Sequence, residues 1–83
     1  MKRIISLLVL NKPGVLNRIT NLFSKRNYNI ESISVGLSEQ EGMSRITCVI
    51  YVESDQQSEQ ITKQLNKQID ILKVTDITNQ AVV

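Results

Sequence analysis

The chain has 83 residues, of which 22% are charged and 41% hydrophobic, and its formal net charge is +2. A chain of this length forms one domain with a small core, so dimerisation would be a natural source of added stability. It contains no histidine and a single cysteine, which excludes an internal disulfide, the usual zinc sites and the usual pairs of nucleophile and base. We therefore expect no catalysis and no cofactor or metal bound by this chain.

Membrane insertion and secretion are also not expected. No apolar segment reaches the length needed to cross a bilayer, and the N-terminal apolar stretch runs on without a small-residue cleavage site. Cys48 lies within the apolar run 46–52, where a small buried side chain in a reducing compartment is the simplest interpretation. These features predict a cytoplasmic protein.

The first predicted elements are a strand and a helix joined by a short turn. An apolar run over 4–10 predicts a buried strand, and the turn Asn11-Lys12-Pro13-Gly14 follows it. Helical spacing is then shown by a set of apolar residues: Val15, Leu16, Ile19, Leu22 and Phe23. Pro13 suits a first helical turn, and Gly14 lets a ligand approach the main chain.

The turn is a candidate anion site because the first N–H groups of a helix have no partner within it and carry partial positive charge. A carboxylate or phosphate would bind there favourably. Taken alone, however, a motif this short is more often an ordinary capped turn.

The middle of the chain predicts a hairpin. Asn27 can take the left-handed conformation that ends a helix, and the polar turn 39–42 separates two alternating segments. The second strand, over 29–37, places three apolar residues on one face and small or polar ones on the other: Ile33, Val35 and Leu37 against Ser32, Ser34 and Gly36. The third strand has four alternating residues, Ile46, Cys48, Ile50 and Val52.

The last elements are a helix and a strand. Ser54 and Gln57 resemble a capping box, and Ile61 and Leu65 continue a helix that is polar elsewhere. The segment 69–78 is rich in β-branched residues, which suits a strand. We assign 1–78 to the domain and 79–83 to a C-terminal tail.

The resulting order is that of the ferredoxin-like α+β fold, a four-stranded antiparallel sheet with two helices on one face. Strands one and three lie in the centre of that topology. The second strand is at an edge, where it can pair with its twin in a homodimer.

Two sets of charged residues and one apolar face of the predicted sheet can each be interpreted in two ways. Six basic residues precede the first acidic one, Glu31, and we favour a solvated face over an anionic partner for them: Lys2, Arg3, Lys12, Arg18, Lys25 and Arg26. The carboxylates of Glu39 and Glu41 are interpreted as solvated turn charges rather than an acid and base pair. The sheet face opposite the predicted core also carries apolar residues, Ile4, Leu8, Val49 and Tyr51, so another chain or domain is expected to pack there.

An RNA-binding domain of the same fold class is a weak alternative. Such domains stack bases on aromatic side chains of the central strands, and here the third strand offers Tyr51 as its one aromatic residue. We expect no nucleic-acid partner. A structural or assembly module that holds a partner without binding a small molecule is the second alternative.

Two segments resemble a known family. The strings Leu10-Asn11-Lys12-Pro13-Gly14-Val15-Leu16 and Arg26-Asn27-Tyr28-Asn29-Ile30-Glu31-Ser32 are similar to those of ACT domains. More narrowly, the chain resembles the small regulatory subunits of acetolactate synthase, also called acetohydroxyacid synthase. The resemblance extends from the first strand to Ser44-Arg45-Ile46-Thr47, and Tyr-Asn-Ile-Glu-Ser is its specific part.

The resemblance implies a function in branched-chain amino-acid biosynthesis. Such a subunit binds and activates a catalytic large subunit, which holds thiamine diphosphate, magnesium and flavin, and it confers feedback inhibition by valine or a related amino acid. The effector then lies at the dimer interface, and the matching positions are Asn11, Gly14, Val15 and Leu16 of one chain with Asn29 and Ile30 of the other.

The chemistry of these residues fits an amino acid. Its carboxylate would accept from the N–H groups of Gly14, Val15 and Leu16, while the Asn11 and Asn29 amides would orient the ligand and accept from its ammonium.

Two features depart from the family pattern. Asn27 stands where glycine is frequent, which asparagine tolerates. The chain also stops shortly after its last strand, so it is either a short natural form or a fragment. The effector site is expected to be intact, and the extent to which the chain activates the catalytic subunit is left open.

Overall fold

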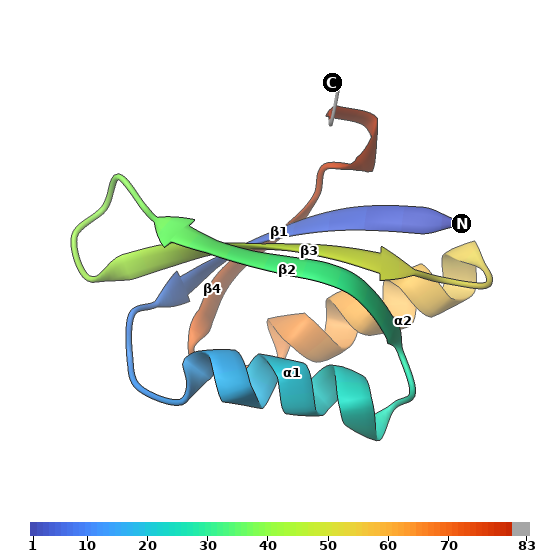
Figure 1. Ribbon diagram of the computed structural model, residues 1–83, viewed down its shortest axis with the longest axis horizontal. Coiled ribbons are helices and arrows are strands. Elements are labelled where there is room, and N and C mark those ends of the chain that lie inside the picture. Colours follow the sequence, from blue (N-terminus) through green and yellow to red (C-terminus); the bar gives the residue numbers. More distant parts are fainter. Residues whose placement is uncertain (81–83) are drawn as a thin grey trace.

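The computed structural model describes residues 1–80 and contains four strands and two helices over that range (Figure 1). The elements in chain order are β1 (Lys2–Leu10), α1 (Val15–Lys25), β2 (Asn29–Leu37), β3 (Met43–Tyr51), α2 (Asp55–Asn66), β4 (Ile71–Asp76) and a 3-10 turn, η1 (Thr78–Gln80). Residues 81–83 of the predicted tail lie outside the described range.

The sheet has the strand order β2-β3-β1-β4, and all three pairings are antiparallel. Both helices lie on the same face of it (Figure 1). The predicted ferredoxin-like fold is therefore confirmed, with the first and third strands central and β2 at an edge. In β2, a register shift between Ile30 and Ser32 leaves Glu31 as an extra residue opposite β3.

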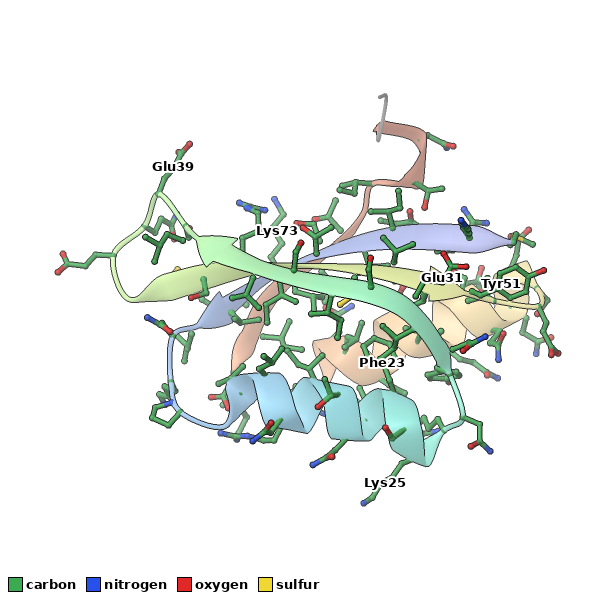
Figure 2. All side chains as sticks on the ribbon, in the orientation of Figure 1. Phe23, Lys25, Glu31, Glu39, Tyr51 and Lys73 are labelled. Carbon is green, nitrogen blue, oxygen red and sulfur yellow. The ribbon has the colours of Figure 1, made fainter. Side chains whose placement is uncertain are left out.

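The core lies between the sheet and the helices because alternate residues of the central strands point that way. In β1, Ile5 and Leu7 are fully buried and pair with Cys48 and Ile46 of β3. Figure 2 shows Phe23 of α1 between its helix and the sheet. The helices contribute Val15, Ile19, Phe23, Ile61 and Leu65 to this core. Burying a side chain of this size stabilises the fold by about 1.5–3 kcal/mol.

Several local predictions are confirmed. Asn27 has φ 57, in the left-handed region, just after α1 ends. The predicted cap forms at Ser54, since the Gln57 main-chain N–H donates to Ser54 Oγ at 3.2 Å. The return bond of the capping box is shifted by one residue, because the Gln57 side chain accepts from the main-chain N–H of Glu53 at 2.7 Å. Cys48 is buried and makes no disulfide.

Two element boundaries and the exposure of one residue differ from the predictions. Pro13 lies before the first helical turn, because Gly14 is the N-cap and α1 begins at Val15. Leu16 is 41% exposed rather than part of the buried stripe, because β2 at the sheet edge leaves that side of α1 uncovered. The last strand starts at Ile71, since Ile69 stands 89% exposed in the turn before it. None of the helices in residues 1–80 is long and apolar enough to cross a membrane.

Candidate functional site

The turn between β1 and α1 is fixed by main-chain hydrogen bonds to two other parts of the fold. The Leu10 N–H donates to the Asp70 carbonyl at 2.9 Å, and the Asn11 N–H donates to the Gly42 carbonyl at 2.9 Å. Gly14 follows with φ 86 and ψ −8, a left-handed conformation that a side chain would strain. The turn is thus a rigid entry to α1 between the β2–β3 loop and the start of β4.

The main-chain donors at the start of α1 are partly free. Within residues 1–80, the N–H groups of Gly14 and Leu16 have no hydrogen-bond partner, whereas that of Val15 donates to the Lys12 carbonyl at a long 3.4 Å. No side chain caps this end of the helix. Two of the three expected donors are therefore available to a carboxylate, and the third makes a weak internal bond.

The cleft beside this turn is small within one chain. Its volume is ≈ 70 Å³, and its walls include Asn11, Leu16, Val35 of β2 and Ser44 of β3. Sites for small ligands usually enclose about 300 Å³ or more. One chain alone therefore does not enclose an amino acid here, and the edge strand β2 contributes one wall of the cleft through Val35.

Asn29 and Ile30 lie elsewhere in the chain. They begin β2, whereas the cleft is lined by Val35, six residues further along that strand, or about 20 Å at the usual rise of an extended chain. Asn29 is exposed, and Ile30 is half-buried against the core. The structure thus places Asn11, Val15 and Leu16 on the cleft, with Gly14 next to it in the turn, and leaves Asn29 and Ile30 apart from them.

The free edge of β2 carries an apolar patch, formed by Val35 and Leu37, and Leu16 of α1 lines the same cleft as Val35. Val35 and Leu37 are 53% and 90% exposed, and they project from the sheet face that carries the helices. Exposed apolar side chains next to an unpaired strand edge are typical of an interface between chains. The edge itself has main-chain groups ready to pair with another strand.

The electrostatics of the turn are governed by a residue that the sequence analysis did not single out. Asp70 is 7% exposed, and its carboxylate lies 2.7 Å from Nη1 of Arg18 and 3.9 Å from Nζ of Lys12. It therefore neutralises two cations beside the start of α1. The remaining positive character at that point comes from the main-chain N–H groups.

The other charged residues in the described part of the chain include two further ion pairs. Lys2 pairs with Glu31 at 3.2 Å, and Arg3 pairs with Asp55 at 2.5 Å. Residues 1–80 contain no group of three or more side chains that could hold a metal ion. Burial raises the pKa of the Cys48 thiol to about 11, which keeps it protonated and unreactive at neutral pH.

Comparison with known proteins gives the same family that the resemblance of the turn segment indicates. The model of the AHAS small subunit-like ACT domain matches residues 5–73. The acetolactate synthase small subunit of Bacillus subtilis (strain 168) is 69% identical over 83 residues, which is 100% of this chain and 48% of that protein. The acetolactate synthase small subunit of Mycolicibacterium smegmatis is 54% identical over 72 residues, 87% of this chain and 42% of that protein.

A solved structure gives the same result. The crystal structure of the acetolactate synthase small subunit from Thermotoga maritima superposes with a TM-score of 0.85 at 43% identity, covering 92% of this chain and 47% of that one. The chain thus spans about half the length of the relatives that it matches.

Proposed function

This chain belongs to the ACT domains of acetohydroxyacid (acetolactate) synthase small subunits, and from that premise we propose that it is a cytoplasmic regulatory subunit. In this proposal it binds and activates a catalytic large subunit, where the thiamine-diphosphate chemistry takes place. It also confers feedback inhibition by a branched-chain amino acid, with valine as the first candidate. The observation that carries the proposal is the turn at Gly14, with open N–H donors, beside an unpaired edge strand.

Each part of an amino acid has a matching group around the turn. The carboxylate would accept from the main-chain N–H groups of Gly14 and Leu16 and gain from the dipole of α1. The branched side chain would contact Leu16 and Val35, which are exposed in the single chain. The Asn11 amide, also exposed, would accept from the ammonium.

The remaining wall of the site would come from a second copy. If β2 pairs antiparallel with its twin across a twofold axis centred near Ile33, Asn29 of one chain lies opposite Leu37 of the other. Leu37 pairs with Ser44, and Ser44 lines the cleft. A homodimer through β2 would therefore carry Asn29 and Ile30 of each chain to the turn of its partner and close the cleft.

Calorimetric titration of the purified chain with valine, leucine and isoleucine tests this function. We expect a dimer in solution that binds at least one of the three amino acids, with alanine as a control ligand too small to fill the apolar wall. No binding by any of them to a dimeric chain would refute the effector role.

An assembly module without an effector is the second candidate, and the small single-chain cleft favours it. The two candidates differ in one measurement on the complex. If the large subunit is bound and activated but its activity does not respond to any branched-chain amino acid, the chain is an assembly module.

A further inference from the structure

The sheet face opposite the helices carries two cations in line with an apolar residue. Leu8 of β1 pairs with Arg45 of β3 on one side and with Lys73 of β4 on the other. The three side chains thus form a row across the sheet, with the two cationic residues about 10 Å apart at the backbone. Figure 2 shows Lys73 on the face away from Phe23 and the helices.

A second row of hydroxyl groups lies next to the first. Ser6 pairs with Thr47 and Thr75, so three hydroxyl-bearing residues follow one another across β3, β1 and β4. Nη1 of Arg45 donates to Ser6 Oγ at 3.0 Å, and Ser6 is nearly buried. This bond holds the guanidinium on the sheet while its outer donors stay available to a partner.

Together the rows form a depression, which we call the cationic face and define by Ser6, Leu8, Arg45, Lys73 and Thr75. It has a volume of ≈ 440 Å³, and Gln40 and Ile77 also line it. No carboxylate oxygen within residues 1–80 lies within 4.0 Å of either cation, in contrast to the paired cations Arg3 and Arg18.

We propose that the cationic face is the surface on which the chain docks an acidic segment of the catalytic large subunit. A carboxylate would accept from the Arg45 guanidinium, and a second one from Lys73. Leu8 and Ile77 lie between and beside the cations, so the occupant must also cover apolar surface. A polypeptide segment does this, whereas a free inorganic anion does not. The inference rests on the proposed function, since it names where the large subunit binds.

The location of this surface separates it from the effector site. The turn at Gly14 opens toward the β2 edge on the helix side of the sheet, whereas the cationic face spans β3, β1 and β4 on the other side. β3 contributes to both, with Ser44 at the cleft and Arg45 next to it on the cationic face. Charge reversal on the cationic face should therefore leave valine binding intact.

The test measures the affinity of the large subunit for three forms of the chain. These are the wild type, the double variant R45E/K73E, and the control K25E/R26E, which makes the same change of charge at the end of α1. Lys25 points away from the sheet in Figure 2. A fourth form, R45Q/K73Q, removes the charge while keeping polar side chains, and valine calorimetry on every form verifies that the fold is retained.

We expect R45E/K73E to weaken large-subunit binding by about tenfold or more, R45Q/K73Q to have a smaller effect, and K25E/R26E to bind as the wild type does. Raising the salt concentration should weaken the wild-type complex and leave R45E/K73E nearly unaffected. Equal affinity of R45E/K73E and wild type, or equal losses in both charge-reversal variants, would overturn the docking surface alone. A change in oligomeric state of R45E/K73E without the large subunit would overturn it in favour of self-association. A wild-type chain that does not bind the large subunit at all would overturn the proposed function as well.

Discussion

The carboxylate of Asp70, immediately before β4, lies 2.7 Å from the guanidinium of Arg18 on α1. Asp70 is nearly buried, and its main-chain carbonyl also accepts from the Leu10 N–H at the end of β1. One residue therefore connects the end of the first strand, the first helix and the start of the last strand. All three meet at the turn that forms the candidate effector site.

Replacing Asp70 with asparagine should loosen this connection. We expect Asp70→Asn to lower the free energy of unfolding by about 1–2 kcal/mol, because the nearly buried Asp70 carboxylate loses its charge-assisted bond to Arg18, whose side chain is 58% exposed. The exposed pair of Lys2 and Glu31 supplies the control, and Glu31→Gln should cost less than about 0.5 kcal/mol. Urea unfolding measures the loss of free energy of unfolding in each variant. Equal losses in the two variants would show that Asp70 does not connect these elements more strongly than an exposed ion pair does.

Two substitutions of Gly14 distinguish the effect of backbone strain from the effect of charge repulsion between the chain and the ligand carboxylate. Asparagine and aspartate have nearly the same size, and both tolerate a positive φ better than most residues do. Gly14→Asn should therefore fold with a modest loss of stability and retain some valine binding, whereas Gly14→Asp should place a negative charge where the ligand carboxylate binds and abolish binding and inhibition. Calorimetry and assays of the reconstituted enzyme compare the pair. Undiminished valine sensitivity in Gly14→Asp would refute the site.

The apolar patch on β2 predicts where two chains meet. Leu37 is 90% exposed in the single chain, so Leu37→Asp should cost the monomer little and prevent dimerisation by placing a charge in the interface. Ile69 is 89% exposed in the turn before β4, and Ile69→Asp is the matched control. Analytical ultracentrifugation should find a monomer for the first variant and a dimer for the second. A dimer for Leu37→Asp and a monomer for Ile69→Asp would show that the interface does not involve β2.

The buried thiol of Cys48 predicts a loss of stability at high pH. Its pKa is raised from 9.0 to about 11 in the folded chain by desolvation. The folded state thus holds this proton more tightly than the unfolded state. The resulting stabilisation is complete below pH 9.0 and is lost as the pH rises toward about 11.

Cys48→Val keeps an apolar side chain of similar size and removes the titrating group. Over that pH range the wild type should lose about 2 kcal/mol more stability than the variant does. Urea unfolding at a series of pH values measures the difference. Parallel curves for the two proteins would show that the thiol is not desolvated.

The arrangement of the strands was predictable because one face of the sheet is buried. A shift of one residue would turn Ile46, Cys48 and Ile50 to the opposite face, so their alternation specifies the orientation of β3. The turn at Gly14 was likewise visible in the sequence, since proline and glycine between a strand and a helical pattern leave few alternatives.

The features that could not be predicted from the sequence depend on contacts between distant parts of the chain. Leu16 fits the helical spacing of the core, and its exposure follows from β2 lying at the sheet edge. Asp70 lies in a segment that resembles a strand, and its partner Arg18 belongs to another element. No local pattern indicates either result. The role of Asn29 depends on a second chain and stays a prediction.

The central claim is that the effector site is shared between two chains, and complementation of two inactive variants tests it most directly. Gly14→Asp damages the turn and Asn29→Asp damages the opposite wall, so each homodimer should fail to bind valine. After refolding together in equal amounts, half of the dimers are mixed, and each has one site with an intact turn and an intact Asn29. Calorimetry should then find valine binding at about a quarter of all sites. Binding that stays absent in a mixture shown to contain mixed dimers would contradict the shared site.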